Sequence, residues 1–385
     1  MEDLPIPLRN TPDERPGAQT IRRISVWLVP LTSHETYYMA DGKTCATVET
    51  AVIRVETDGG LSGWGEVCPI PGYLPAYAHG VAPALAELAP VLLGADTVGA
   101  EAAMARAEAR LKDHRYAKSA LDIALWDITG QVAGLPLMAL LGGRQAADLP
   151  LYHSITCIDP DEMARIAREA QAAGMKQFQA KLGADQDWQA DAERLRAVRA
   201  AVGPGPLVYG DWNCGATRLH ATRTGRAVAD LDVMLEQPCE TLTDCAAVRA
   251  ATGLAMKIDE NAHDTQSLLE ANRLGCLDAV ALKLSKFGGL SALRRARDLC
   301  LYLGAEMCIE CTWGSDISTA AALHLAAATP PKSVLNVCDL SGYVAPRLDP
   351  MAPARQGGRI LPPEGPGLGI HIDPDRLGSP AAIFD

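Results

Sequence analysis

The chain has 385 residues, which at about 150 residues per domain suggests two domains or one large domain with an appendage. Hydrophobic residues make up 48% and charged residues 21%, so the chain can bury a substantial core, which excludes a small disulfide-stapled module and a broadly disordered chain. The formal net charge of −12 disfavours nucleic acid or a membrane as the main partner.

Residues 1–20 contain acidic residues, arginine and four prolines, and they predict a flexible N-terminal extension rather than the apolar core of a signal peptide. No run of about 18 uncharged apolar residues follows, so we expect no membrane-spanning segment. The eleven cysteines are scattered through apolar segments, where free cysteine behaves as a small buried hydrophobe. These features predict a cytoplasmic protein with reduced cysteines.

Residues 21–145 predict an α+β domain. Ile21–Leu31 is rich in apolar residues, Val48–Glu56 alternates between apolar and polar residues, and Asp58-Gly59-Gly60 is typical of a hairpin turn. From Val81 to Ala133 apolar residues recur at intervals of three and four, which predicts helices. A small sheet is therefore followed by several helices, and a glycine pair places the domain boundary near residue 145.

Residues 146–343 follow a regular rhythm of short β-rich runs, each followed by a helical segment. The runs are 151–156, 177–182, 207–212, 233–237, 255–259, 279–284, 306–311 and 335–339. Eight evenly spaced strands alternating with helices predict an α/β fold of the (β/α)8 barrel type rather than an open doubly wound sheet. Residues 344–385 are rich in proline and glycine, contain no further βα unit, and are predicted to return to the N-terminal region.

A charged residue closes each run from the second to the seventh. These residues are Lys181, Asp211, Glu236, Asp259, Lys283 and Glu310, and their spacings are 30, 25, 23, 24 and 27 residues. Each spacing corresponds to about one βα unit, so the six side chains should occupy equivalent positions on successive strands. Catalytic groups of such barrels lie at the C-terminal ends of the strands, and we therefore expect these six on one rim.

Three of these residues, Asp211, Glu236 and Asp259, come from adjacent strands and form a cluster of hard oxygen ligands. Such a cluster favours Mg²⁺ over Zn²⁺. Lys181 and Lys283 lie four strands apart in a ring of eight, so they should face each other across the mouth of the barrel. A substrate carboxylate held on the metal would then have a proton acceptor on one side of its α-carbon and a donor on the other. The simpler alternative is that the lysines form salt bridges with the carboxylates.

Further motifs extend from residue 64 to the C-terminal tail. They are Trp64-Gly65-Glu66, the segment 116–122 leading to Trp126-Asp127, Leu141-Gly142-Gly143, Glu236-Gln237-Pro238, Asp259-Glu260 and Gly365-Pro366-Gly367-Leu368-Gly369. Through these motifs the chain resembles the enolase superfamily, in its mandelate racemase/muconate lactonizing enzyme subgroup. Sites of that superfamily can combine a lysine base with Mg²⁺.

The resemblance implies a barrel with an N-terminal α+β capping domain that the C-terminal tail completes. It also implies that Lys181 and Lys283 are the acid/base pair and that Asp211, Glu236 and Asp259 bind Mg²⁺, with Mn²⁺ as a substitute. The partners expected are a small amino or imino acid substrate and further copies of the chain in a homo-oligomer. The subgroup commonly has Lys-x-Lys on the second strand, whereas this chain has Gln179-Ala180-Lys181 and keeps only the second lysine.

Within the subgroup, Phe178-Gln179-Ala180-Lys181 and the segment 310–317 are similar to the branch that acts on proline derivatives. That branch contains cis-3-hydroxy-L-proline dehydratases and hydroxyproline-betaine 2-epimerases. The residue after the acid of the seventh strand is usually Asp in the branch, and here it is Cys311. The reaction expected is removal of the α-proton, followed either by loss of hydroxide or by reprotonation on the opposite face.

Several residues are candidates for contacts around the substrate. Trp313 could hold an ammonium against its ring or plug the barrel mouth, and Asp316 could balance the substrate nitrogen or cap a helix beginning at Ile317. Tyr38, with its neighbours Tyr37 and Met39, lies on a segment that would cover the barrel mouth if the domain arrangement of the family holds. Further candidates near the site are Glu310, Gln179, Asn213 and Lys286.

The alternatives are a muconate-type cycloisomerase, a dipeptide epimerase, and a binding or redox protein without catalytic activity on a barrel scaffold. Dipeptide epimerases typically carry Asp-x-Asp on the last strands, and this chain has no such motif there. Cys308 and Cys311 have the spacing of a redox motif, but they lie within an apolar strand. The regular spacing of both lysines argues against the alternative without catalytic activity.

Overall fold

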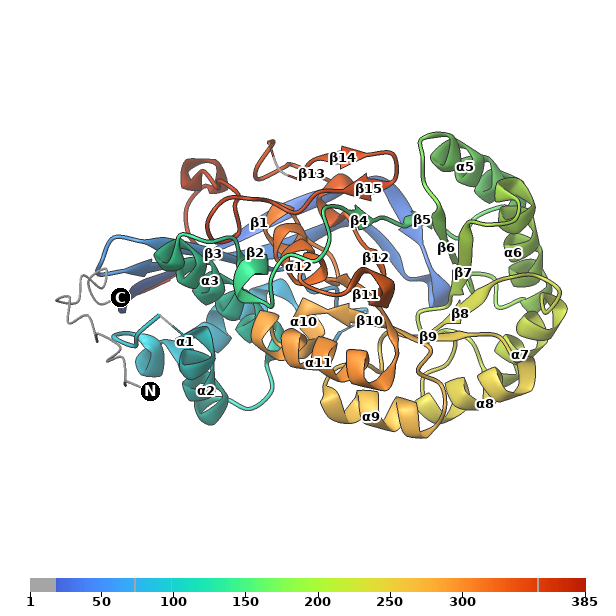
Figure 1. Cartoon of the computed structure of the whole chain (residues 1–385), viewed down its shortest axis with the longest axis horizontal. Coiled ribbons are helices and arrows are strands. Elements are labelled where there is room, and N and C mark those ends of the chain that lie inside the picture. Colours follow the sequence, from blue (N-terminus) through green and yellow to red (C-terminus); the bar gives the residue numbers. More distant parts are fainter. Residues whose placement is uncertain (1–18, 73, 98, 352) are drawn as a thin grey trace, which may run out of the picture.

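The computed structural model describes residues 19–72, 74–97, 99–351 and 353–385. The predicted extension over 1–20 therefore lies outside the described residues, apart from Gln19 and Thr20. The described chain forms an antiparallel sheet with helices, seen at the left of Figure 1, and a parallel barrel surrounded by helices towards the right. None of its helices is long and apolar enough to cross a membrane.

The capping domain is built on an antiparallel sheet with the order β13-β1-β2-β3, in which β16 also pairs with β1. Its strands are β1 (Ile21–Tyr38), β2 (Thr44–Thr57), β3 (Ser62–Val67), β13 (Val344–Ala345) and β16 (Ala382–Phe384). The helices that follow are α1 (Val81–Leu92), α2 (Ala100–Arg110), α3 (Arg115–Ala133) and α4 (Leu137–Leu140). The last strand comes from the C-terminal segment, which thus pairs with the first strand of the capping domain.

Helix α3 packs closely against β3 because glycines line the contact. A Cβ atom added at Gly65 would lie 1.7 Å from the carbonyl oxygen of Ala120, and one at Gly63 would lie 2.1 Å from that of Ala124. Only glycine permits so close an approach of a strand to a helix backbone. Gly63 and Gly65 are therefore required for the packing of the capping domain.

The barrel consists of eight parallel strands in the order β12-β11-β10-β9-β8-β7-β6-β5. They are β5 (His153–Ile155), β6 (Gln177–Lys181), β7 (Leu207–Asp211), β8 (Met234–Glu236), β9 (Met256–Ile258), β10 (Ala279–Lys283), β11 (Glu306–Glu310) and β12 (Val334–Val337). A parallel bridge between Leu151 and Val337 joins the two ends of the sheet. The predicted (β/α)8-type fold is thereby confirmed: the first seven predicted runs each contain one of these strands, and the eighth overlaps β12, which begins one residue earlier.

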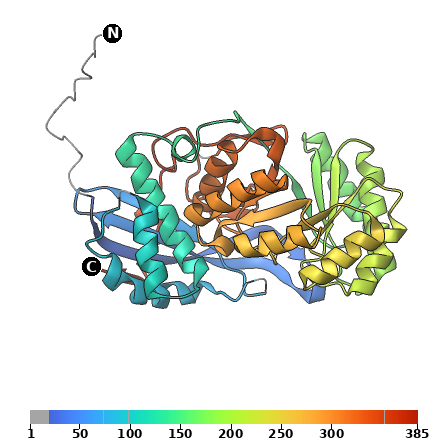
Figure 2. The same cartoon turned by 60° about the horizontal axis from the view of Figure 1, so that its bottom comes forward.

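The barrel strands are covered by helices on their outer side (Figures 1 and 2). The helices are α5 (Pro160–Ala172), α6 (Trp188–Val202), α7 (Arg218–Ala227), α8 (Leu242–Thr252), α9 (Thr265–Arg273), α10 (Leu284–Phe287), α11 (Leu290–Leu303) and α12 (Asp316–Ala327). Side chains of Asp159, Asp187, Thr217, Thr241 and Asp264 accept from backbone N–H groups at the starts of α5 to α9. These caps satisfy donors that a helix leaves free at its first turn.

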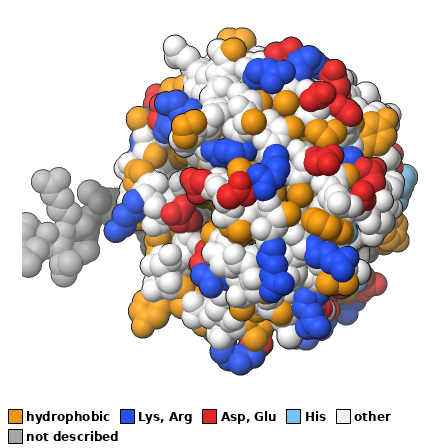
Figure 3. Space-filling view, turned by 90° about the vertical axis from the view of Figure 1, so that its right-hand side faces the viewer, with side chains coloured by type: hydrophobic (Ala, Val, Ile, Leu, Met, Phe, Trp, Pro, Cys, Tyr) orange, Lys and Arg blue, Asp and Glu red, His pale blue; other side chains and the backbone are white. Residues whose placement is uncertain are grey.

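A small antiparallel sheet, β14-β15-β4, lies beside the barrel. It is formed by β14 (Arg355–Gln356), β15 (Arg359–Ile360) and β4 (Leu149–Pro150). The outer face seen from the right of Figure 1 intermixes basic and acidic side chains (Figure 3). That face has no single sign of charge.

Two buried carboxylates connect the capping domain with the barrel. Glu66 of β3 accepts from the backbone N–H groups of Ser315 and Ser318, where α12 begins, and Asp122 of α3 accepts from the backbone N–H and hydroxyl of Ser291 in α11. Both carboxylates are completely buried. We call Glu66 and Asp122 the seam carboxylates, because they fix the orientation of the capping domain over the barrel.

Candidate active site

The strand register brings the predicted rim residues together. Lys181, Asp211 and Glu236 are direct neighbours across β6, β7 and β8, and Lys283 is paired with Glu310 across β10 and β11. Asp259 follows the last residue of β9. One end of the barrel therefore carries all six residues that the spacing predicted there.

The three rim carboxylates, Asp211, Glu236 and Asp259, are each neutralised by lysine. Four ion pairs join lysines to these carboxylates. They are Lys181 Nζ–Asp211 Oδ2 at 2.5 Å, Lys257 Nζ–Glu236 Oε1 at 2.8 Å, Lys283 Nζ–Asp259 Oδ2 at 2.7 Å and Lys286 Nζ–Asp259 Oδ1 at 2.6 Å. The salt-bridge alternative for Lys181 and Lys283 is thus the arrangement in this structure. Among the described residues, no three acidic, histidine or cysteine side chains converge as they would around a metal ion.

The pKa values reflect this concentration of charge. Burial, together with the neighbouring carboxylates, raises the pKa of Glu236 to about 7 even though Lys257 opposes the shift. Burial would raise the pKa of Asp259 too, but Lys283 and Lys286 hold it well below its usual range. Burial alone would lower the pKa of Lys181 and of Lys283, whereas their carboxylate partners raise both above the ordinary lysine value.

The donor chemistry of the rim nevertheless fits a divalent cation. Asp211, Glu236 and Asp259 supply only carboxylate oxygens, which is the ligand type that Mg²⁺ prefers. A fourth acid, Glu260, has its Oε2 buried without a hydrogen-bond partner. Burial and the charges of Asp259 and Asp211 raise the pKa of Glu260 to about 8. Glu260 thus places a further carboxyl oxygen near these ligands that no described group satisfies.

Two amide side chains hold the carboxylates in place. Gln179 donates from Nε2 to Asp211 Oδ2 at 3.1 Å and to Glu236 Oε2 at 2.8 Å, while its Oε1 accepts from Ser154. Asn213 donates from Nδ2 to Asp211 Oδ2 and to Glu260 Oε1, both at 3.1 Å. Each amide nitrogen therefore bridges two acidic groups and fixes their spacing.

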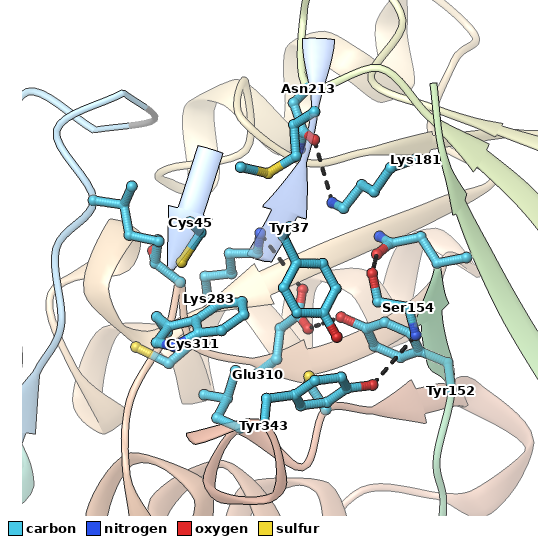
Figure 4. Close-up of a pocket in the computed structure, with 17 residues that line it drawn as sticks. Tyr37, Cys45, Tyr152, Ser154, Lys181, Asn213, Lys283, Glu310, Cys311 and Tyr343 are labelled. Atoms are coloured by element: carbon cyan, nitrogen blue, oxygen red, sulfur yellow. Dashed lines mark hydrogen bonds and ion pairs between the residues drawn. The ribbon is translucent and has the colours of Figure 1, made fainter. Parts of the chain in front are cut away.

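A small cavity of about 60 Å³ opens beside these carboxylates, and both Lys181 and Lys283 line it (Figure 4). Besides Tyr152, three aromatic rings that pack on one another line it, with centroid separations of 5.7 Å for Tyr37–Trp313, 5.9 Å for Tyr37–Tyr343 and 6.1 Å for Trp313–Tyr343. We call these three residues the aromatic wall. The cavity therefore combines two ammonium groups with an apolar surface.

Glu310 is the carboxylate that lines the cavity itself, among the residues the structure describes. Its Oε2 accepts from the hydroxyl of Tyr152 at 2.8 Å, and its Oε1 lies 3.6 Å from Lys283 Nζ. Cys311, which stands where the related branch usually has Asp, also lines the cavity. Cys308 is fully buried, and neither cysteine forms a disulfide.

Tyr38 lies on a segment that reaches the barrel, but its side chain does not line the cavity. Its side chain is 47% exposed and is absent from the cavity wall, whereas its neighbours Tyr37 and Met39 line the cavity. Successive strand residues face opposite sides, so only one of two adjacent tyrosines can face inwards. The ribbon of β1 and β2 does reach the barrel: the backbone N–H of Tyr38 donates to Thr156 Oγ1, and Lys43 Nζ donates to the carbonyl of Asn213.

Asp316 is also not a substrate contact in this structure. It is buried away from the cavity, and it accepts from the backbone N–H groups of Leu348 and Asp349 and from Arg347. Its side chain does not cap α12 either, because that helix begins after Ser315 and Asp316 turns towards the tail. Asp316 therefore anchors the segment 347–349.

The sequence analysis missed several residues of the site. Lys257 lies inside β9 rather than at its end, Tyr152 and Ser154 belong to the first predicted run, and Tyr343 is the last residue of the predicted barrel domain. Lys257 is two residues before Asp259, and this period of two was the signal that could have placed both in the barrel interior. The other three carried no charge that would have singled them out.

Two family models match the chain. "Mandelate racemase / muconate lactonizing enzyme, N-terminal domain" matches residues 23–142, and "Enolase C-terminal domain-like" matches residues 162–376. A cis-3-hydroxy-L-proline dehydratase of Roseibium aggregatum is 38% identical over 94% of this chain and 99% of its own length. An N-succinyl-L-Arg/Lys racemase of Bacillus cereus is 27% identical over 93% of this chain and 96% of its own length.

Solved structures give the same result. The crystal structure of a member of the enolase superfamily from Roseovarius nubinhibens ISM, complexed with magnesium, has a TM-score of 0.90 and 35% identity to this chain. The match covers 95% of this chain and 99% of that one. The predicted resemblance is thereby confirmed over both domains.

Proposed function

This chain belongs to the mandelate racemase/muconate lactonizing enzyme family of the enolase superfamily, and on that premise we propose that it dehydrates cis-3-hydroxy-L-proline or a close proline derivative. Membership makes the chain an enzyme of the isomerase and dehydratase type with a small-molecule substrate. The choice of dehydration is supported by the 38% identity to the dehydratase of Roseibium aggregatum.

The observation that carries the proposal is that Lys181 and Lys283 line one small cavity from strands that lie four apart in the sheet. A compact ring with a carboxylate would meet two ammonium groups and an apolar surface in this cavity. Held between the two lysines, its α-carbon would have an amine on either face. One lysine, as the neutral amine, takes the α-proton, and the other acts as an ammonium on the opposite face.

The stereochemistry of the substrate matches this arrangement. In cis-3-hydroxy-L-proline the hydroxyl and the carboxylate share one face of the ring, so the α-hydrogen lies on the face opposite the hydroxyl. Removing the α-proton on one face leaves its electron pair on the α-carbon. That pair forms the C2–C3 double bond as the C3–O bond breaks, and the ammonium on the other face protonates the departing hydroxide to water. The resulting enamine then becomes the cyclic imine by proton transfer to C3.

Asp211, Glu236 and Asp259 are the residues that would hold Mg²⁺, with Mn²⁺ as a substitute. Bound there, the cation would supply positive charge to the substrate carboxylate and stabilise the negative charge that develops when the α-proton leaves. Gln179 and Asn213 hold the carboxylates at their present spacing. Occupation of the carboxylates by a cation would also release Lys181 and Lys283 from their ion pairs.

The aromatic wall and Glu310 suit the substrate nitrogen. A cation near an aromatic face is attracted to the ring, and Trp gives the strongest such attraction. Glu310 provides a negative charge in the same cavity. We therefore assign the secondary ammonium of the ring to this side of the cavity, with Trp313 and Glu310 as its contacts.

The alternative is a 2-epimerase acting on hydroxyproline betaine or proline betaine. The same two lysines support it, because one could remove the α-proton and the other return a proton to the opposite face. The racemase relative shows that isomerisation occurs among similar chains. Only the presence of a leaving group at C3 distinguishes the two outcomes.

The test is a panel of cis-3-hydroxy-L-proline, trans-3-hydroxy-L-proline, L-proline and hydroxyproline betaine, followed by proton NMR in D₂O with Mg²⁺. We expect rapid formation of the cyclic imine from the cis isomer and at least about tenfold slower formation from the trans isomer, in which hydrogen and hydroxyl share a face. Epimerisation of the betaine without imine formation from the cis isomer would favour the alternative. No reaction with any of the four would contradict the proposal.

A further inference from the structure

Lys257 is a buried lysine within the barrel that no step of the proposed reaction uses. It lies in β9 between Met256 and Ile258, and its side chain is completely inaccessible to solvent. Burying an ammonium group is costly unless other groups offset its charge. The position therefore requires a specific partner.

The partner is the rim carboxylate Glu236. Lys257 Nζ lies 2.8 Å from Glu236 Oε1, although neither atom has a hydrogen bond of acceptable geometry with any group in the described part of the chain. Two rings complete the surroundings of the ammonium, with Tyr209 at 4.7 Å and Tyr152 at 5.5 Å from their centroids. The ammonium is thus held by one charge and two aromatic rings.

Lys257 differs in its position from Lys181 and Lys283. Lys181 and Lys283 line the cavity, so each could rotate into it when its carboxylate binds another cation. Lys257 does not line the cavity and is completely buried, with Glu236 as its ion-pair partner in the described part of the chain. Its charge therefore stays beside Glu236 whatever else that carboxylate binds.

The other oxygen of Glu236 has only a neutral partner among the described residues. Oε2 accepts from the amide of Gln179 at 2.8 Å, which contributes no formal charge. Oε1 faces the ammonium, so a cation bound by Glu236 would share the carboxylate with a fixed positive charge. Two positive charges on one buried carboxylate repel each other strongly, because little solvent screens them.

We propose that Lys257 acts through Glu236 as a fixed opposing charge that weakens the binding of the divalent cation by Asp211, Glu236 and Asp259. The inference rests on the proposed function, since it takes these three carboxylates as cation ligands. Because Lys257 partly neutralises Glu236, the cation would keep more of its positive charge for the substrate carboxylate. Lys257 touches neither the substrate nor the cavity and is therefore a positioning and tuning residue.

The test is the Mg²⁺ affinity of the metal-free full chain at pH 8, measured by isothermal titration calorimetry for the wild type, Lys257→Met and Lys257→Gln. We expect the Kd of both variants to be at least about tenfold lower than that of the wild type. The rise in Tm that Mg²⁺ produces should also be larger in both variants, because the cation then balances a carboxylate that has lost its ammonium.

Lys118→Met is the matched control. Lys118 is equally inaccessible and also paired, with Glu108 at 2.8 Å, but it lies in α3 of the capping domain. Its loss should lower Tm without changing the Kd for Mg²⁺ or the size of the Mg²⁺-induced rise. A purely structural role of Lys257 would make its variants behave like Lys118→Met.

An unchanged or higher Kd in the Lys257 variants would overturn the inference while leaving the proposed function standing. Failure of both variants to fold, even with Mg²⁺ present, would also overturn it, because the ammonium would then serve folding itself. A variant that folds only with Mg²⁺ would support it. Absence of Mg²⁺ binding by the wild type would instead contradict the proposed function, on which the inference depends.

Discussion

The seam between the two domains and the rim of the barrel both bury carboxylates, but they neutralise them in different ways. At the seam, Glu66 and Asp122 accept from backbone N–H groups and hydroxyls at the starts of α12 and α11. At the rim, Asp211, Glu236 and Asp259 face the ammonium groups of lysines. Neutral donors satisfy the first group, whereas the second group faces ammonium charges in addition to neutral amides.

The kind of partner determines what the carboxylates of each region can do. A backbone N–H is fixed by its helix, so a seam carboxylate keeps its partners as long as the domains remain docked. Two of the rim lysines, Lys181 and Lys283, line the cavity and can leave their carboxylates for another position. The seam therefore serves stability, whereas in the proposed function the rim would exchange an ammonium for another cation and use the released amine in the reaction.

Removal of divalent cations should have the largest effect. We expect EDTA to abolish turnover and added Mg²⁺ to restore it, because the charge that develops on the substrate carboxylate has no comparable stabilising group among the described residues. The seam needs no cation, so the far-UV circular dichroism spectrum should remain unchanged. Full turnover in thoroughly metal-free protein would show that the rim, like the seam, needs no cation.

Glu236→Gln should have the next largest effect. The substitution keeps the volume but removes one negative charge from the cation ligands, and it leaves Lys257 beside a neutral amide. We expect at least about a tenfold rise in the Kd for Mg²⁺, with a loss of turnover even at saturating Mg²⁺. Calorimetry and steady-state kinetics measure the two effects. An unchanged Kd would exclude Glu236 from direct contact with the cation.

Glu66→Gln tests the seam in the same way. Glu66 accepts from two backbone N–H groups and from the hydroxyls of Ser315 and Thr50. The glutamine side chain would replace one accepting oxygen with an NH₂ group, which would then face these donors. We expect a loss of about 2–3 kcal/mol of stability, seen as a lower Tm. The Kd for Mg²⁺ should stay at the wild-type value. A weaker Mg²⁺ affinity with an unchanged Tm would reverse the roles assigned to the two regions.

A further effect at the seam concerns pH. Burial raises the pKa of Asp122 to about 7 against the hydrogen bonds from Ser291, with Arg295 and Glu101 as the charged neighbours. The folded state therefore holds the proton more tightly than the unfolded state, whose carboxyl titrates near pH 4. The stability contributed by the protonated form is present below about pH 4 and is lost as the pH rises towards 7.

Asp122→Asn should remove this dependence. The difference in stability between the variant and the wild type should shift in favour of the variant by about 1.4 kcal/mol for each pH unit between about 5 and 7. Melting curves at pH 5, 6 and 7 measure the shift. A difference that does not change with pH would mean that Asp122 is already ionised in the folded protein at pH 5.

The sequence predicted the rim well because a parallel barrel repeats its unit. One charged residue at the end of each run is enough to place Lys181, Asp211 and Lys283 at one end of the barrel, provided that the runs are strands. The ends of the runs do not reveal Lys257, because this lysine lies inside its strand. It also left the salt bridges of the lysines as an alternative, and only the folded arrangement gives their distances.

The residues that cover the cavity were harder to predict. In β1 and β2 the register shifts between Thr32 and Tyr37, and a shift of one residue moves a side chain to the other face of a strand. The sequence therefore could not distinguish Tyr37, which faces the cavity, from Tyr38, which faces solvent. For Asp316 the deciding partners lie 31 to 33 residues further along the chain, where local patterns give no information.

The central claim is that Lys181 and Lys283 act on opposite faces of one α-carbon, and single substitutions test it most directly. Exchange of the α-hydrogen with D₂O should be followed by proton NMR for both enantiomers of proline, using Lys181→Ala and Lys283→Ala with Mg²⁺. We predict that each variant exchanges one enantiomer and not the other, that the two variants have opposite preferences, and that both lose epimerisation. Exchange of both enantiomers at the wild-type rate in both variants would contradict the claim.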